Sequence, residues 1–199
     1  MVKVKFCGIA SLEDAILAEK LGADFIGFVT DTASPRFVKK DFIGFVRRYV
    51  EIPTVEVIVK GNVSESIDKT KADLIQIHRV LTRRELDEIH MYRKKVILYV
   101  PSSDMYQEYF RSVISMGFNV LVDSEIKGSK VNLDLARGWA KEYEIGIGGG
   151  ISPDNLHDFL SINPKWIDVS SGIEKYKGKK DPSKMLKIIE GVRKWKYTQ

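Results

Sequence analysis

The chain has 199 residues, of which 44% are hydrophobic and 30% are charged, so it can bury a core and is neither a disordered nor a collagen-like sequence. Its longest apolar runs have about six or seven residues, too few for a membrane span, and its first residues lack the apolar core of a signal peptide. The net charge of +5 permits anionic partners without requiring them, while a single cysteine excludes an internal disulfide and favours a reducing cytoplasm.

Short runs rich in β-branched residues recur along the chain, with helical patterns between them. The predicted strands are residues 2–6, 25–29, 54–59, 74–78, 96–100, 120–123, 145–148 and 166–169. No two of them are joined by a two-residue hairpin turn, and nearly all are apolar throughout, which is typical of parallel strands buried on both faces.

Helix-start signals stand in the gaps: capping residues, a capping-box pattern, or proline at the first helical position. The predicted openings are Ser11, Ser64, Thr82 with Glu85, Ser152-Pro153 and Pro182. Gly22 is predicted to end the first of these helices, because glycine readily adopts the left-handed conformation that stops a helix.

A strand followed by a helix, repeated eight times at about 24 residues each, predicts an α/β protein with the single-domain (β/α)8 TIM barrel fold over residues 1–199. No linker or low-complexity tract divides the chain. An open flavodoxin-like sheet, which needs fewer strands, is the alternative.

In a barrel of this kind the active site lies where the strands end. Six predicted strand ends carry polar reactive side chains or glycines. They are Lys5 with Cys7, the loop Ser34-Pro35-Arg36, Gln76 with His78, Asp123, Gly148-Gly149-Gly150, and Asp168-Val169-Ser170-Ser171-Gly172. This concentration indicates an enzyme.

The glycine-containing loops after predicted strands seven and eight indicate a phosphate site. Backbone amides at such loops can approach an anion closely, and barrels of this class often bind phosphate there. The predicted phosphate-binding residues are Gly149, Gly150, Ser170, Ser171 and Gly172. The loops match neither a P-loop nor the dinucleotide pattern, because Ile151 stands where the third glycine belongs.

Three other strand-end residues each allow two interpretations. Cys7 is a small buried hydrophobe, or a base or nucleophile whose pKa is lowered by Lys5 or Arg36. Asp123 is a helix cap, or a sugar ligand or an acid–base group with a pKa raised by burial. Arg36 forms a surface ion pair, or clamps a carboxylate or phosphate.

Other ligand classes are not favoured. His78, His90 and His157 are widely separated and show no metal-ligand spacing, so no metal site is predicted. Nine of the 32 basic residues lie beyond Glu174, but no aromatic platform or nucleic-acid motif accompanies them, so a solvated last helix is favoured over a nucleic-acid tail.

Several of these segments, taken in chain order, resemble those of the phosphoribosylanthranilate isomerases of tryptophan biosynthesis, nearly from end to end. The resemblance rests on Lys5-Phe6-Cys7-Gly8-Ile9, residues 22–28, Ser34-Pro35-Arg36, Gln76-Ile77-His78, Val122-Asp123-Ser124, residues 149–155, residues 168–174 and Gly178-Lys179-Lys180-Asp181. Two features depart from the family: Arg79 replaces a usual glycine, and residues 125–131 keep only Gly128 of a glycine-rich stretch.

The resemblance implies an aldose–ketose isomerase. It implies an Amadori rearrangement of N-(5-phosphoribosyl)anthranilate to 1-(2-carboxyphenylamino)-1-deoxyribulose 5-phosphate, with no metal or organic cofactor. Asp123 would be the general acid, Cys7 the general base, and Arg36 the ligand of the anthranilate carboxylate. We expect the pKa of the thiol to be shifted downward and that of the carboxyl upward.

The remaining expectations concern binding. His78 and Asp168 are expected to bind substrate, and the two glycine loops to hold its phosphate. The expected partner is a small phosphosugar, with no nucleic acid and no membrane, and the protein is expected to be a cytoplasmic monomer or homodimer. A dual-substrate aminoaldose isomerase, which resembles this chain in its phosphate loops but uses paired aspartates, and a non-catalytic nucleic-acid binder are the competing hypotheses; Cys7 argues against the first.

Overall fold

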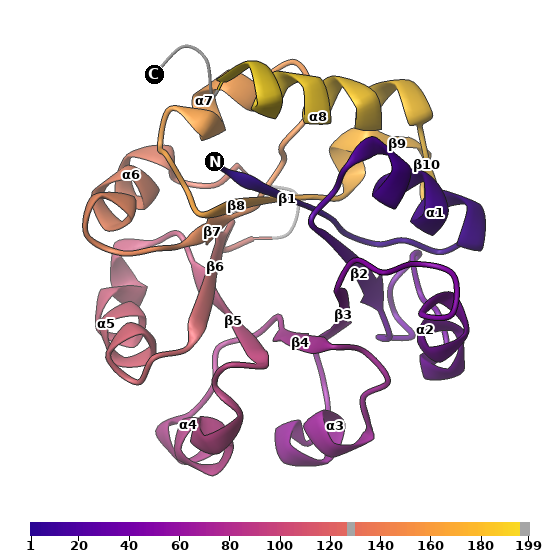
Figure 1. Ribbon diagram of the computed structural model, residues 1–199. Coiled ribbons are helices and arrows are strands. Elements are labelled where there is room, and N and C mark those ends of the chain that lie inside the picture. Colours follow the sequence, from indigo (N-terminus) through magenta and orange to yellow (C-terminus); the bar gives the residue numbers. More distant parts are fainter. Residues whose placement is uncertain (127–129, 196–199) are drawn as a thin grey trace.

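Eight parallel strands close into a barrel, with the helices arranged around its outside (Figure 1). The computed structural model describes residues 1–126 and 130–195. In hydrogen-bonded order the strands are β1 (Lys3–Phe6), β2 (Phe25–Val29), β3 (Thr54–Ile58), β4 (Leu74–Ile77), β5 (Val96–Pro101), β6 (Asn119–Asp123), β7 (Gly146–Ile147) and β8 (Trp166–Val169). The predicted fold is confirmed, and each predicted strand end lies within one residue of the observed one. Residues 127–129, on which the predicted departure around Gly128 falls, lie outside the described residues.

The helices follow the strands in alternation. They are α1 (Leu12–Leu21), α2 (Lys40–Val46), α3 (Val63–Lys69), α4 (Arg83–Ile89), α5 (Gln107–Ser115), α6 (Leu133–Glu142), α7 (Leu156–Leu160) and α8 (Pro182–Trp195), with short 3₁₀ turns η1 (His90–Tyr92), η2 (Asp104–Tyr106) and η3 (Ser171–Ile173). Among the described residues, none of these helices combines the length and the apolar character that crossing a membrane requires.

Side-chain caps explain most of the helix starts. The Ser11 hydroxyl accepts a hydrogen bond from the Asp14 amide, and the helix ends at Gly22 with φ of 97°. The capping box of Thr82 is present as predicted. The predicted start at Ser64 is wrong, because the side chain of Asn62, two residues earlier, already caps α3.

The predicted start of a helix at Ser152-Pro153 is also wrong. The Asn155 side chain accepts a hydrogen bond from the Ser152 amide and donates one to the Gly150 carbonyl. These two bonds fold residues 150–155 into a turn, so the chain becomes helical only at Leu156. The glycine loop after β7 is therefore separated from α7 by a turn that Asn155 holds.

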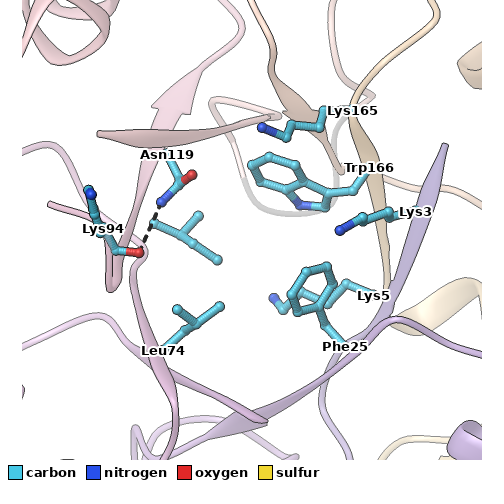
Figure 2. Close-up of a pocket in the computed structure, with 9 residues that line it drawn as sticks. Lys3, Lys5, Phe25, Leu74, Lys94, Asn119, Lys165 and Trp166 are labelled. Carbon is cyan, nitrogen blue, oxygen red and sulfur yellow. Dashed lines mark hydrogen bonds between the residues drawn. The ribbon is translucent and has the colours of Figure 1, made fainter. Parts of the chain in front are cut away.

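Apolar side chains fill the barrel toward its amino-terminal end. Trp166, Val55, Ile97 and Leu121 form a separate buried cluster there. The indole of Trp166 lies 2.0 Å from the point where a Cβ of Gly146 would be, so the absent side chain provides the space for the ring. Figure 2 shows the open part of this end, a cavity of about 140 Å³ with lysine side chains near its rim.

The barrel closes between its first and last strands, which lie side by side in Figure 1. Lys5 pairs in register with Asp168 across this seam. Outside the barrel, Asp14 of α1 accepts hydrogen bonds from the side chain of Lys179 and the amide of Lys180. The latter two residues form β10 (Lys179–Lys180), which pairs with β9 (Glu174–Tyr176) in a short hairpin absent from the predicted elements.

Candidate active site

The predicted site residues gather at the carboxyl ends of the barrel strands. They are Cys7, Arg36, His78, Asp123, Gly149, Gly150, Asp168, Ser170, Ser171 and Gly172. The side chains of Arg36 and Ser170 both approach Gly8, and the carboxyl oxygens of Asp123 lie beside Gly148 and Gly149. Residues far apart in sequence therefore line one end of the barrel.

Cys7 follows β1 directly and is 7% exposed. Its amide donates to the Val169 carbonyl of β8, which fixes the backbone beneath the thiol. The sulfur and the Cε atom of Lys5 lie 2.9 and 3.0 Å from the point where a Cβ of Gly27 would be. A side chain at position 27 would displace one of the two groups, so glycine there allows the thiol and the lysine to lie together.

The predicted downward shift of the thiol is wrong for the free protein. Burial raises the pKa of Cys7 above its ordinary value of 9.0, and the negative charge of Asp168 raises it further. The positive charges of Lys5 and Lys180 lower it, without compensating fully. Sequence reasoning identified a cation close to the thiol, but it underestimated the penalty for burying a charge in this position.

Asp123 ends β6, and its pKa is shifted as predicted. Burial, with a smaller contribution from the charge of Asp168, raises the pKa of Asp123 to about 6, although hydrogen bonds from Ser124 favour the ionised form. The Ser124 amide donates to Oδ1 over 2.6 Å and its hydroxyl over 3.2 Å. A carboxyl with this pKa can hold a proton close to neutral pH, as a general acid must.

A buried ion pair, Lys5 with Asp168, interacts with both of these groups. The Lys5 ammonium donates to Asp168 Oδ2 over 2.9 Å and to Gln76 Oε1 over 2.6 Å. The same pair acts electrostatically on both Cys7 and Asp123. Asp168 Oδ1 is buried and has no hydrogen-bond partner in the described structure, so it can still accept one.

His78 lies next to this cluster. Its ring stacks on Tyr99 with centroids 4.4 Å apart, and its Nδ1 lies 3.2 Å from the amide nitrogen of Gln76. Tyr99 donates its hydroxyl hydrogen to the Ser124 carbonyl, next to Asp123. The stacked rings therefore lie close to Asp123.

Arg36 forms an ion pair, one of its two predicted alternatives. Its Nε and Nη2 atoms each donate to one carboxylate oxygen of Glu174 over 2.7 Å, so it forms an ion pair, but a partly buried one. The pairing leaves Nη1 outside the bidentate contact. Lys180, itself 1% exposed, lies 3.4 Å from the same carboxylate and donates to the Ser170 carbonyl.

The two glycine loops touch. A Cβ on Gly172 would lie 1.9 Å from the carbonyl oxygen of Ile151, so the loop after β8 packs directly on the loop after β7. Gly149 and Gly150 have φ of 91° and 85°, a region that side-chain-bearing residues rarely adopt. Such a backbone can present its amides to an anion.

Sequence reasoning did not assign roles to Glu174, Lys180 or Tyr99. Glu174 and Lys180 stand in the segments that carried the resemblance, yet their pairing depends on a hairpin that sequence analysis did not predict. Tyr99 looked like an ordinary strand residue. Within the described part of the chain, no group of three or more His, Cys, Asp or Glu side chains is arranged to hold a metal ion.

The fold and this site define a (β/α)8 barrel enzyme of the acid–base type. The family model of N-(5'-phosphoribosyl)anthranilate (PRA) isomerase matches residues 4–191. The N-(5'-phosphoribosyl)anthranilate isomerase of Saccharolobus solfataricus is 46% identical over 197 residues, covering 97% of each chain. That of Pyrobaculum aerophilum is 31% identical, covering 96% of this chain and 99% of its own. The chain belongs to the N-(5'-phosphoribosyl)anthranilate isomerase family, and it is an isomerase of tryptophan biosynthesis.

Solved structures agree. Monomers generated from the dimeric phosphoribosylanthranilate isomerase of Thermotoga maritima superpose with a TM-score of 0.86 at 26% identity, covering 98% of this chain and 100% of that one. A phosphoribosylanthranilate isomerase in complex with reduced 1-(o-carboxyphenylamino)-1-deoxyribulose 5-phosphate gives a TM-score of 0.83 at 26% identity, with the same coverage.

Proposed function

We propose that this isomerase converts N-(5'-phosphoribosyl)anthranilate to 1-(2-carboxyphenylamino)-1-deoxyribulose 5-phosphate, with Asp123 as general acid and Cys7 as general base. One observation carries the assignment of roles. A carboxyl whose pKa is about 6 and a thiol both interact with one buried ion pair, Lys5 with Asp168, at the barrel end where the glycine loops lie. Acid and base can therefore act on the same small molecule.

The acid step opens the sugar ring. Protonated Asp123 gives its proton to the ring oxygen, the bond between that oxygen and C1 breaks, and the nitrogen lone pair forms the C1=N bond of a Schiff base. The stacked rings of His78 and Tyr99 lie on this side of the site, since the Tyr99 hydroxyl donates to the Ser124 carbonyl next to Asp123.

The base step moves the double bond. The Cys7 thiolate takes the proton from C2, the C–H electron pair forms a C1=C2 bond, and the C=N pair returns to nitrogen. The resulting enolamine takes a proton at C1 and loses the proton of its C2 hydroxyl, which gives the ketone. Each proton transfer of this kind accelerates a reaction by roughly 10²–10⁴-fold.

Binding groups orient the substrate between acid and base. The amides of the Gly149-Gly150 loop and of Ser170, Ser171 and Gly172 hold the phosphate, and Asp168 Oδ1, buried without a partner, accepts a hydrogen bond from a sugar hydroxyl. Arg36 donates from Nη1 to the anthranilate carboxylate, while Glu174 accepts from the Nε and Nη2 atoms of the same guanidinium group. His78, which follows β4, also contacts the substrate.

The proposed mechanism also bears on the protein's cellular location and its oligomeric state. A cytoplasmic location suits it, because a reducing compartment keeps the lone catalytic thiol unoxidised. We also propose a monomer or a homodimer. All the groups assigned above come from one chain, so neither state requires a residue from a partner.

Turnover of freshly prepared substrate tests the assignment. We expect Cys7→Ala and Asp123→Asn each to lose at least about 10²-fold in kcat while folding normally. Asp104→Asn, which removes an exposed aspartate next to β5, is the matched control and is expected to keep full activity. Full activity in either site variant would refute the role given to that residue.

A further inference from the structure

We propose that Lys5 is the positioning residue of this site, and that its buried ammonium directs one N–H at the Cys7 sulfur and so stabilises the thiolate when it forms. The proposal deepens the assignment of Cys7 as the base and rests on it. Lys5 acts through Cys7, because its ammonium is enclosed among side chains of the barrel and only 1% of the residue is exposed.

The barrel fixes the ammonium from two sides. A lysine ammonium has three N–H donors and no acceptor. Two of the three go to Gln76 of β4 and Asp168 of β8, over 2.6 and 2.9 Å, so Lys5 spans the barrel interior from β1. The third donor remains for a nearby acceptor.

The Cys7 sulfur is the acceptor placed to receive it. The sulfur and Lys5 Cε share the space opened by the missing side chain of Gly27, each within 3.0 Å of the same point. Lys5 favours the ionised thiol both through its charge and through a side-chain hydrogen bond. Since Cys7 lies only two residues after Lys5 in the chain, backbone movement cannot easily separate them.

The charges that face Cys7 come from four elements and oppose one another. Lys5 of β1 and Lys180 of β10 stabilise the thiolate, whereas Asp168 of β8 destabilises it, and Arg36 in the loop after β2 also interacts with the sulfur. Burial alone would lower the pKa of Lys5, but the charges of Asp168 and Cys7 outweigh that effect and raise it. Lys5 therefore stays positively charged when the base is required.

The proton balance is simple. Cys7 gains the proton removed from the sugar, and Lys5 keeps its own three throughout. When the thiolate becomes a thiol, the ammonium loses a charged partner but keeps Gln76 and Asp168, so its position does not change. The next turnover then begins with the same geometry.

The chain has one cysteine, which makes the test direct. The pH-dependent ultraviolet absorbance of the substrate-free protein, taken as the difference from Cys7→Ala, reports the Cys7 thiolate alone, because the eight tyrosines titrate in both proteins. We expect Lys5→Gln to raise the thiol pKa and Asp168→Asn to lower it. At a fixed pH below the pKa, we expect the thiolate fraction to fall at least about tenfold in the first variant and to rise at least about tenfold in the second.

Opposite signs separate the proposal from a structural role. If the pair of Lys5 and Asp168 had only a structural role, either substitution would loosen the same contact and shift the thiol pKa in the same direction. Changes of the same sign, or no change in Lys5→Gln, would therefore overturn the proposal. Lys187→Gln, which removes an exposed lysine of α8, is the matched control and is expected to leave the titration unchanged.

Lys5→Gln leaves Asp168 buried without its cation and can fail to fold. A second comparison, between the single variant Asp168→Asn and the double variant Lys5→Gln/Asp168→Asn, avoids this problem, because neither protein contains an unpaired carboxylate at position 168. The thiol pKa should be higher in the double variant than in the single one, and equal values would refute the proposal. None of these titrations uses substrate, whereas the role of Cys7 as the base is tested by the turnover of Cys7→Ala. The two proposals can therefore be refuted separately.

Discussion

Arg36 and Glu174 are joined by two hydrogen bonds of 2.7 Å, although 138 positions separate them in the chain. Glu174 also accepts from the Gly178 amide and from Lys180. Burial would raise the pKa of Glu174, but these donors, Arg36 foremost, hold it below its ordinary value. One carboxylate thereby links the loop after β2 to the loop that carries Ser170.

This link predicts that Glu174→Gln weakens substrate binding more than it slows chemistry. An amide cannot accept both guanidinium bonds, and it leaves Arg36 and Lys180 facing each other without a shared anion. We expect KM to rise about tenfold or more with a smaller change in kcat. Wild type should bind an inhibitor with the anthranilate carboxyl more tightly than one without it. In Glu174→Gln this difference in affinity should disappear. Glu65→Gln on α3, an exposed ion-paired glutamate, is the control.

The pKa of Asp123 predicts the pH dependence of kcat/KM. Catalysis requires Asp123 protonated and Cys7 ionised, although the pKa of Asp123 is about 6 and that of Cys7 is raised above 9.0. The population of this minor form rises with pH up to about 6, is then level, and falls above the thiol pKa. NMR titration of the carboxyl carbon should assign the acid limb to Asp123; a titration far below that limb would contradict the assignment.

The raised pKa of Asp123 also predicts a stability change. A carboxyl whose folded pKa exceeds its unfolded value stabilises the fold when protonated, and this contribution is lost as pH rises through about 6. Asp123→Asn should therefore be more stable than wild type near pH 8, by up to about 3 kcal/mol, and equal to it near pH 4. Urea unfolding at the two pH values measures this, with the exposed Asp104→Asn as the control.

The contact between the glycine loops predicts an effect on phosphate binding. In Gly172→Ala the new methyl group would meet the Ile151 carbonyl, and the two loops must separate. We expect KM to increase about tenfold or more, and affinity for inorganic phosphate to fall with it. Gly138→Ala on α6, where nothing lies within 4 Å, should leave both unchanged and add about 0.5–1 kcal/mol of stability. Unchanged phosphate affinity in Gly172→Ala would argue against the loop assignment.

The packing of Trp166 on Gly146 predicts a different result at the other end of the barrel. In Gly146→Ala the new methyl group would overlap atoms of the Trp166 indole. Overpacking of this kind lowers the free energy of unfolding by about 1–3 kcal/mol. Adding Trp166→Leu should recover part of the loss in urea unfolding. Activity per folded molecule should remain, because the proposed acid, base and phosphate ligands lie at the opposite end of the barrel strands; a large fall in kcat would contradict that separation.

The sequence was sufficient for the parts of the structure that depend on local signals. Strand positions followed from short apolar runs, and the caps Ser11 and Thr82 were predicted because a polar side chain and its amide partner lie within one turn. Where two caps competed, as at Asn62 and Ser64, the choice depended on loop geometry that the pattern does not encode.

The electrostatics of the site were only partly predictable. The upward shift of Asp123 follows from burial at a strand end, which the sequence indicates. The downward shift expected for the pKa of Cys7 was wrong because burial raises that pKa, by an amount that depends on how closely the barrel is filled. The charge of Asp168 on the neighbouring strand raises it further. The partner of Arg36 depends on the β9–β10 hairpin, which forms from a segment of only seven residues and carries no apolar alternation.

The seam between β1 and β8 has a consequence for how the protein is made. On the ribosome, β1 finds β2 early, but its other edge stays unpaired until β8 has been synthesised. Cys7 hydrogen-bonds to Val169 and Lys5 pairs with Asp168 across this seam, so the nascent chain has neither the base nor its cation in place until the last barrel strand docks. Catalytic competence and closure of the barrel are therefore a single folding event.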